Sequence, residues 1–317
     1  MKKTLCLVLS VLMVLTVVLT GCGKKLVLAT GGTSGTYYSY GGILANQIKG
    51  SAGITVNVVS TDGSKANILG IDEGNYQLAT VQSDVMAYAV AGERSFEEEG
   101  ALDSFRVIGG LYAEAVQLVT MNPDIKSVAD LKDKKVSIGA AGSGVYFNAV
   151  DVLGAAGLTE ADIKPQYQSF ADSADALKDG KIDAAFIVAG TPTPAIEELF
   201  TSASAYLVPI DGDIAAKLMS DSPYYTSYTI PAGTYPEQDS DVTTVTVKAT
   251  LIVSTSASED DVYKITKAIF DNAGAIKDAH AKGAELSLEN ATAGMTAPFH
   301  KGAAKYFAEN NITVESK

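Results

Sequence analysis

The chain contains very few of the side chains that most often carry covalent or metal chemistry. Among its 317 residues there are two cysteines, Cys6 and Cys22, and two histidines, His280 and His300. Both histidines fall in the C-terminal part, where we expect surface or packing roles, because a catalytic triad requires a histidine beside its nucleophile. So few nitrogen and sulfur ligands do not make a zinc site. We therefore expect no metal and no other cofactor.

The sequence also lacks the short motifs of nucleotide and ester chemistry. It has no G-x-x-x-x-G-K-[ST] segment for triphosphates and no G-x-S-x-G nucleophile turn. The GAAGSG stretch at residues 139–144 does not match the dinucleotide pattern G-x-G-x-x-G. We predict that the protein is not an enzyme, and a membrane-anchored hydrolase remains the alternative class.

Positive charge is scarce. The 24 lysines and arginines are outnumbered by 37 aspartates and glutamates, for a net charge of −13. This balance argues against nucleic acid as a partner, since phosphate binding needs a basic face. The two arginines, Arg94 and Arg106, lie outside the glycine-rich turns described below. An anionic ligand would thus be held by backbone N–H groups and hydroxyls rather than by an arginine fork.

The N-terminus has the pattern of an export signal. Lys2 and Lys3 precede an apolar run over residues 4–19, and the sequence LTGC follows at residues 19–22. This end resembles a bacterial lipobox, so we expect cleavage before Cys22, lipid on its thiol, and an extracytoplasmic, membrane-anchored protein. Lipidation would also account for the odd cysteine left after export. An uncleaved anchor is the alternative, although the apolar run is short for a span of about 20 residues.

The remaining chain alternates between strand-like and helix-like segments, which indicates an α/β fold, and its length suits two domains. Residues 24–38 (KKLVLATGGTSGTYY) and 134–148 (KKVSIGAAGSGVYFN) repeat one local order of lysine pair, strand, glycine-rich turn and aromatic residue. A strand, such a turn and a helix N-terminus together favour anion binding. Each turn could equally be a tight connection with a serine or threonine N-cap. Two matched turns that face each other favour a ligand cleft.

We place two chain crossings between the domains. Residues 105–112 and 114–121 read as two strands with the first crossing between them, and residues 243–254 read as one long β-branched strand that returns. Such crossings form a natural hinge for closure over a ligand. The predicted organisation is a signal peptide at 1–21, a first lobe at 22–113, a second lobe at 114–243, and the rest of the first lobe with C-terminal helices at 244–317.

Three further details come from local residue types. Gly50 should end the first helix, because glycine is the usual residue after a helix C-terminus. Residues 166–170 read as a strand. Pro192 reads as part of the first turn of a helix, where proline is tolerated.

Six segments together resemble a known family. They are ATGGTSGTYY (29–38), TDGSKANI (61–68), LATVQSDV (78–85), IGGLYAE (108–114), SVADLKDKKVSIGAAGSG (127–144) and YTIPAGTY (228–235). They look like the TAXI subfamily of solute-binding proteins, which serve tripartite ATP-independent periplasmic (TRAP) transporters, and the resemblance covers essentially the whole mature chain. It implies a two-lobed type II periplasmic-binding-protein-like fold with a hinge between the lobes. It also implies a monomer that hands glutamate, glutamine or a related carboxylate to TRAP membrane permease subunits.

The resemblance points to ligand-binding residues position by position. In the first lobe these are Gly32, Thr33, Ser34, Tyr37, Tyr38, Ser64, Asn67, Gln82 and Ser83; at the hinge they are Tyr112 and Glu114; in the second lobe they are Ser143, Gly144, Val145, Thr191 and Pro192. Val145 departs from the family's pattern, which has threonine there, and this removes one possible hydroxyl.

Several of these residues have an ordinary structural alternative. Glu114 could meet a ligand amine, which would favour amino acids over plain dicarboxylates, or it could be a surface carboxylate at a strand start. Tyr112 could pack at the hinge or cover the ligand, and Asn67 and Gln82 could cap turns. Lys65 could add charge at a helix start, although lysine is mostly exposed. The predicted ligand is a glutamate- or glutamine-like amino acid, with a plain dicarboxylate as the alternative.

Overall fold

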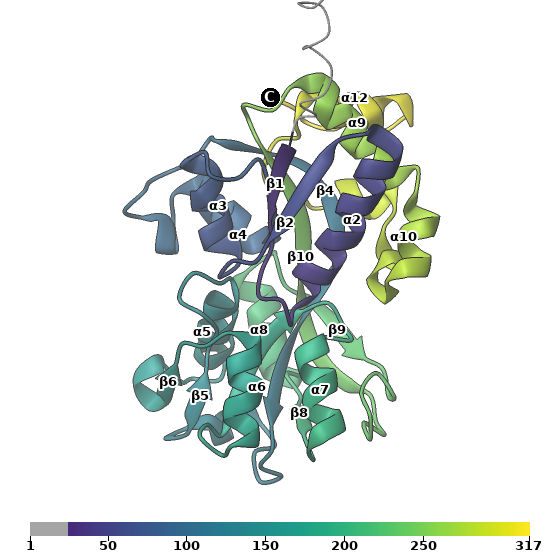
Figure 1. The fold of residues 1–317 in the computed structure, drawn as a ribbon. Helices are drawn as coiled ribbons and strands as arrows, with labels where there is room; N and C mark the ends of the chain where they lie inside the picture. The colour runs from purple at the N-terminus through teal and green to yellow at the C-terminus, as the bar shows by residue number, and fades with distance from the viewer. Residues whose placement is uncertain (1–24) are drawn as a thin grey trace, which may run out of the picture.

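The computed structural model describes residues 25–317, which form two lobes joined through a shared sheet (Figure 1). The predicted signal segment and Cys22 lie outside the described residues. In the described part, ten strands form one sheet with the order β2-β1-β3-β10-β4-β7-β5-β6, with β8 beside β4 and β9 beside β10. Helices alternate with the strands along the chain, so the α/β class and the two-lobed architecture are confirmed.

The first lobe begins as three parallel strands, each followed by a helix. The branched residues of the second strand and the buried Leu26 and Leu28 of the first suit a sheet covered by helices. The elements are β1 (Lys25–Ala29), α2 (Thr36–Ala52), β2 (Thr55–Val59), α3 (Ser64–Asp72), β3 (Leu78–Gln82), α4 (Ser83–Ala91) and the short η1 (Arg94–Phe96). Since β1 pairs in parallel with both β2 and β3, the turns that follow these strands lie at one edge of the sheet.

Two long antiparallel strands connect the lobes. The first, β4 (Phe105–Thr120), is continuous, so the prediction of two separate strands was wrong. Its glycine pair lies inside the strand because neighbours pack directly on the backbone: a Cβ on Gly109 would lie 3.0 Å from the ring of Phe270. The second, β10 (Val242–Ser254), returns beside β4, with register irregularities between Lys248 and Thr250 and between Leu251 and Ile252.

The second lobe follows β4 along the chain and lies below the first in Figure 1. Its strands β5, β6 and β7 are parallel, and β7 pairs with the second half of β4 in the antiparallel sense. The elements are η2 (Val128–Leu131), β5 (Lys135–Ser137), α5 (Val145–Ala155), η3 (Glu160–Asp162), β6 (Lys164–Gln166), α6 (Phe170–Lys178), β7 (Ala184–Ala189), α7 (Pro194–Ser202), β8 (Tyr206–Val208), α8 (Gly212–Asp221) and β9 (Thr226–Ile230).

The segment after β10 packs on the first lobe. Its elements are α9 (Glu259–Phe270), α10 (Ala273–Ala279), η4 (Ala281–Glu285), α11 (Leu288–Thr292) and α12 (Lys301–Glu309). Helix α9 buries Val262, Ile265 and Ile269 at helical spacing against the sheet. Phe299 forms an isolated bridge with Val107 of β4, so the C-terminal segment is also tied to the sheet edge.

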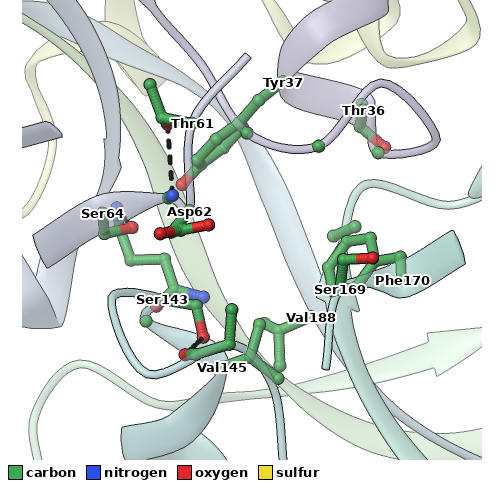
Figure 2. A pocket seen from close by; sticks show the side chains of 18 of the residues that line it. Thr36, Tyr37, Thr61, Asp62, Ser64, Ser143, Val145, Ser169, Phe170 and Val188 are labelled. Carbon is green, nitrogen blue, oxygen red and sulfur yellow. Dashed lines mark hydrogen bonds between the residues drawn. The ribbon is translucent and has the colours of Figure 1, made fainter. Parts of the chain in front are cut away.

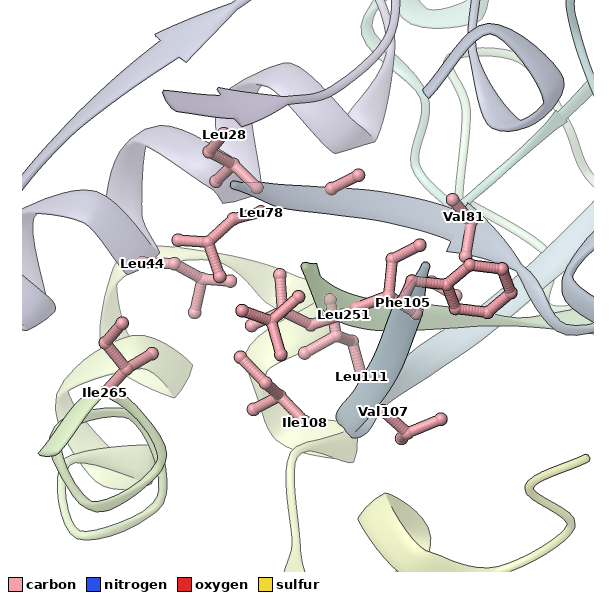
Figure 3. Close-up of a cluster of buried hydrophobic side chains, with 14 of the residues drawn as sticks. Leu28, Leu44, Leu78, Val81, Phe105, Val107, Ile108, Leu111, Leu251 and Ile265 are labelled. Carbon is pink, nitrogen blue, oxygen red and sulfur yellow. The ribbon is translucent and has the colours of Figure 1, made fainter. Parts of the chain in front are cut away.

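The buried apolar side chains form one large cluster in the first lobe and two in the second. The first-lobe cluster, seen in part in Figure 3, joins Leu28, Leu78 and Leu251 of the sheet with Leu44 and Ile265 of the helices. The two second-lobe clusters lie on opposite faces of the sheet. Leu118 belongs to one cluster and Val119 to the other, and successive residues of a strand point to opposite faces.

Three local predictions were wrong. Helix α2 continues past Gly50 to Ala52 and is followed by Gly53, whose φ of 70° is the left-handed conformation that glycine adopts readily. Residues 166–170 do not form a strand, because β6 ends at Gln166 and α6 begins at Phe170. Helix α7 begins at Pro194, and Pro192 precedes it. Within residues 25–317, no helix combines the length and the apolar character needed to cross a membrane.

The contact between α12 and α9 gives a test of this packing. A Cβ on Gly302 would lie 2.3 Å from the carbonyl oxygen of Glu259 and 2.6 Å from the amide nitrogen of Tyr263. Gly302→Ala should therefore lower the free energy of unfolding by about 1–3 kcal/mol, measured by urea denaturation. The control Gly274→Ala in α10 meets nothing within 4 Å and should be neutral or stabilising. Equal losses in both variants would contradict the packing described here.

Candidate ligand-binding cavity

A cavity of about 80 Å³ lies between the two lobes (Figure 2), which is room for several water molecules or part of a small solute. Both glycine-rich turns reach it, one from each lobe. It is lined by Gly31, Gly32, Gly35, Thr36, Tyr37, Thr61, Asp62, Gly63, Ser64, Gln82, Glu114, Ala140, Ser143, Gly144, Val145, Gln168, Ser169, Phe170, Val188 and Ala189.

Helix N-termini converge on this cavity. Within residues 25–317, its lining includes the N-cap residues of α2, α3, α4, α5 and α6, namely Gly35, Gly63, Gln82, Gly144 and Ser169. They meet because parallel strands of both lobes end here and each strand is followed by a helix. The first-turn N–H groups and the helix dipoles make this wall favourable for an anion.

Three of these N-caps are glycine, which has no side chain to accept from the first-turn N–H groups. Among these five described N-caps, only the side chain of Ser169 makes a capping hydrogen bond, which it accepts from the amide of Asp172. Two of the glycines also allow close approach. A Cβ on Gly144 would lie 1.6 Å from Oε1 of Gln82, and a Cβ on Gly35 would lie 3.3 Å from the ring of Phe170.

Glu114 supplies a buried carboxyl group to the same lining. It lies in β4 and is 1% exposed, so the alternative of a surface carboxylate was wrong. The phenol of Tyr37 donates a hydrogen bond of 2.6 Å to its Oε1. Burial raises the pKa of Glu114 to about 8, and the Tyr37 hydrogen bond and the charge of Lys282 offset only part of this shift. Burial and the neighbouring Glu114 likewise raise the pKa of Tyr37.

The charges around the cavity are almost all acidic. Asp62 and Glu114 belong to its lining, and no lysine, arginine or histidine of residues 25–317 does. Lys282 of η4 acts on the charge of Glu114; it is buried and pairs with Glu285 at 2.5 Å. Its ammonium lies over the ring of Tyr228, 5.4 Å from the centroid. The lining therefore combines a buried carboxyl group with the N-termini of several helices.

Direct hydrogen bonds between the lobes surround the cavity. The hydroxyl of Thr36 donates to the carbonyl of Gly190 at 2.9 Å, and the amide of Ala66 donates to the carbonyl of Gly142 at 3.1 Å. The amide of Ala195 donates to the carbonyl of Ser34 at 3.2 Å. These contacts hold the two lobes together over the enclosed space, as in the closed form of a hinged protein.

Half of the predicted site residues reach the cavity. Those that line it are Gly32, Tyr37, Ser64, Gln82, Glu114, Ser143, Gly144 and Val145. Ser64 and Ser143 also have local roles, since Ser64 accepts a hydrogen bond from the amide of Gln82 and Ser143 donates to the carbonyl of Ala140.

The other eight predicted residues do not line the cavity. Five of them make contacts that support the fold. Asn67 donates to the carbonyls of Thr30 and Thr80, Ser83 accepts from the amide of Lys248, and Ser34 accepts from Ala195. Tyr112 is fully buried against Tyr40, with ring centroids 4.9 Å apart, and the hydroxyl of Thr191 meets that of Tyr228 at 3.2 Å. Thr33, Tyr38 and Pro192 complete this group.

Sequence reasoning missed several lining residues. Thr61, Asp62 and Gly63 belong to the 61–68 segment that carries the family resemblance, but they were not among the predicted ligand-binding residues. The predicted strand at residues 166–170 hid three more lining residues: Gln168 and Ser169 lie in the connection between β6 and α6, and Phe170 is the first residue of α6. The available signal was their position after a strand of a parallel sheet, where ligand sites lie.

The remaining candidates for chemistry lie away from the cavity. His300 and His280 accept from the amides of Gly302 and Lys282 through Nδ1, which is a capping role. Arg94 pairs with Asp151, and Lys65 pairs with Glu99 at 3.4 Å. Among residues 25–317 no group of three or more histidine, cysteine, aspartate and glutamate side chains is arranged to hold a metal ion.

The chain has the fold of a periplasmic solute-binding protein of type II. This class is defined by two lobes with parallel strands, two strands that connect the lobes, and a cavity between the lobes. A protein of Bordetella bronchiseptica RB50 has a similar structure, with a TM-score of 0.55 at 18% identity over 90% of this chain and 88% of that one. So does the alkanesulfonate-binding protein SsuA of Xanthomonas axonopodis pv. citri, with a TM-score of 0.50 at 16% identity over 92% of both chains. An arginine-specific periplasmic binding protein of Salmonella typhimurium gives 0.51 at 12% identity over 82% and 99%.

Within this class, the chain belongs to the NMT1-like family, whose model matches residues 28–310. The match spans nearly the entire part of the chain that the structure describes, so both lobes are included. The structural neighbours are 12–18% identical to this chain, and what they share with it is the fold.

The pKa of Glu114 predicts how stability depends on pH. Because the folded-state pKa is raised from 4.5 to about 8, folding binds a proton between these values. This contribution is complete below about pH 4.5 and is lost as the pH rises through 8. Glu114→Gln keeps an acceptor for Tyr37 but does not titrate.

The free energy of unfolding of wild type relative to Glu114→Gln should therefore fall by roughly 4 kcal/mol between about pH 5 and pH 9. Urea denaturation at both pH values measures this difference, and groups present in both proteins cancel. A difference that does not change with pH would show that Glu114 is charged throughout.

Proposed function

We propose that the protein is a lipid-anchored extracytoplasmic solute-binding protein that captures a small amino acid between its lobes and delivers it to a TRAP-type permease. The observation that carries this proposal is the pairing, in one small cavity, of the buried Glu114–Tyr37 group with uncapped helix N-termini. The helix N-termini suit the carboxylate of an amino acid, and Glu114 suits its ammonium group.

The acidic lining favours an amino acid over a plain dicarboxylate. A dicarboxylate would bring two negative charges beside Glu114 and Asp62 without a basic side chain in the described lining to receive either one. An ammonium group instead supplies the positive charge that stabilises the ionised form of Glu114, and thus lowers its pKa on binding. Binding of an amine should accordingly release a proton near neutral pH.

A glutamine- or glutamate-like side chain fits the remaining polar groups of the cavity. The amide oxygens of Gln82 and Gln168 are buried and have no hydrogen-bond partner within the described residues. Buried acceptors of this kind are normally satisfied, so they favour a ligand with several N–H donors. This chemistry favours glutamine over glutamate, whose side-chain carboxylate offers no donor.

Transport is inferred from the N-terminus and the resemblance to the TAXI subfamily. The lipobox-like sequence before Cys22 would keep the protein at the membrane, where two or more acyl chains give stable anchoring. The two lobes and the two strands between them allow hinge closure, and the closed form would be the one that docks on the permease. Closure is favoured by a ligand that binds the closed form more tightly than the open form.

A ligand screen tests the proposal. L-Glutamine, L-glutamate, L-arginine and succinate would be added to the exported chain, followed by calorimetry. A ligand present at about 100 times its Kd adds about 2.7 kcal/mol of stability, which raises Tm by several degrees. We expect a shift with L-glutamine or L-glutamate and none with succinate. A shift with succinate alone would contradict the proposed contact between Glu114 and an amine.

The close approach at Gly144 gives a second test. Gly144→Ala places a methyl group where Oε1 of Gln82 lies, so the turn or the glutamine must move, and we expect affinity for the ligand found above to fall at least tenfold. Gly32→Ala is the matched control, because Gly32 also lines the cavity and a Cβ there meets nothing within 4 Å. Its Kd should stay within about threefold of wild type. Similar losses in both variants would place the ligand away from Gly144.

A further inference from the structure

A chain of hydrogen bonds runs from outside the cavity lining to Gln82. Asn148 of α5, in the second lobe, donates through Nδ2 to Oδ2 of Asp84 at 2.9 Å and to the hydroxyl of Tyr225 at 2.8 Å. Its Oδ1 accepts from Nε2 of Gln82 at 3.0 Å. Asp84, Asn148 and Gln82 are all buried, and Asp84 and Asn148 are fully so. The contacts between Asn148 and the other two cross from one lobe to the other.

The direction of every bond in this chain is set by charge. Asp84 accepts because it is ionised: burial raises its pKa to about 6, which still leaves the carboxylate charged above neutral pH. The Asn148 amide must therefore turn its nitrogen toward Asp84, since the reverse orientation would put two acceptors together. The same orientation suits Tyr225, whose hydroxyl donates to Asp151 at 2.9 Å and so can accept from Asn148.

This orientation determines which end of Gln82 faces the ligand. With Oδ1 of Asn148 directed at Gln82, only the Nε2 end of Gln82 can lie against it, and Oε1 must point away. Oε1 lies beside Gly144 in the cavity lining, where a Cβ would approach it to 1.6 Å. It is buried and makes no hydrogen bond to any described residue. A buried amide oxygen without a partner, packed against a residue of the cavity lining, is an acceptor that a ligand donor can satisfy.

We propose that Asp84 and Asn148 are specificity-determining positioning residues: acting through Asn148, Asp84 orients the Gln82 amide so that the closed cavity presents an acceptor, and selects ligands that carry an N–H donor there. The proposal rests on the proposed function, because it concerns the same ligand. It also couples selectivity to closure. Asn148 meets Gln82 and Asp84 across the interface between the lobes, so the orientation of Gln82 is fixed when the lobes meet.

A second carboxylate beside this chain supplies the matched control. Asp151 holds the lobes together by accepting two hydrogen bonds from Arg94, at 2.8 and 3.1 Å, and one from Tyr225. Asp151→Asn should weaken closure, yet it leaves Asp84 to orient Asn148. Asp84→Asn weakens closure as well, but it lets the amides of Asn148 and Gln82 turn around, because the introduced amide can face Asn148 with either its oxygen or its nitrogen.

The experiment compares three ligands by calorimetry at about pH 7.5, where Asp84 is ionised. They are L-glutamine, L-glutamate, which lacks the side-chain N–H, and 4-carbamoylbutanoate, which lacks the ammonium group. In Asp84→Asn, the preference for L-glutamine over at least one of the two analogues should fall about tenfold, the amount expected from about 1.4 kcal/mol. In Asp151→Asn all three affinities should fall by a common factor, with the preferences unchanged. Unchanged preferences in Asp84→Asn would overturn the proposal.

A second measurement separates this proposal from the proposed function. If none of the three compounds binds wild type, the proposed ligand class fails, and the hydrogen-bond chain is judged on the free protein by nitrogen-15 spectra of side-chain amides. The amide protons of Gln82 should exchange with water at least tenfold more slowly in wild type than in Asn148→Leu, because Asn148 accepts one of them. Equal exchange rates would overturn the orientation proposed here, and slower exchange in wild type would support it.

Discussion

The antiparallel pairing of β4 with β10 is the constraint on which the rest of the molecule depends. Both strands extend from the core of the first lobe into the second, and Glu114 pairs with Val247 in the segment between the two cores. Because the strands are shared, the lobes cannot move independently, and any opening must bend this pair. The parallel strands of each lobe therefore end toward a common interface, and the helices that follow them begin there (Figure 1).

A buried carboxyl group beside this crossing gives the cavity its chemical character. Removing Glu114 from water favours its protonated form, and the Tyr37 hydrogen bond offsets only part of that effect. The helix N-termini in the same lining carry partial positive charge, so the cavity combines a carboxyl group with groups that favour anions. Such an arrangement is suited to a small zwitterion. The bonds between Asp84, Asn148 and Gln82 extend the same electrostatic control across the interface between the lobes.

The glycine-rich turns could be found in the sequence because their function is local. Glycine permits close backbone approach and offers no side-chain cap, so the two turns were predicted from residue type and position. Within them the family resemblance pointed to Gly32, Ser143 and Gly144, and all three line the cavity. Local signals failed where a residue's role depends on distant partners. Phe105–Thr120 was divided at Ala113, although Ala113 pairs with Lys248 of β10 and Glu114 pairs with Val247, so the strand continues through that point.

The sequence by itself determined the alternation of strands and helices, the presence of two lobes, the two glycine-rich turns and the acidic balance, because each depends on residue type, spacing or composition. Only the tertiary structure decided that Glu114 is buried beside Tyr37, that Asn67 and Tyr112 support the lobes, and that residues 168–170 reach the cavity. The physical reason is that burial and hydrogen-bond partners arise between segments far apart in the chain. Tyr37 and Glu114 are 77 residues apart in the chain, so no local sequence pattern predicts their contact. They come together only when β1 and β4 join the same sheet.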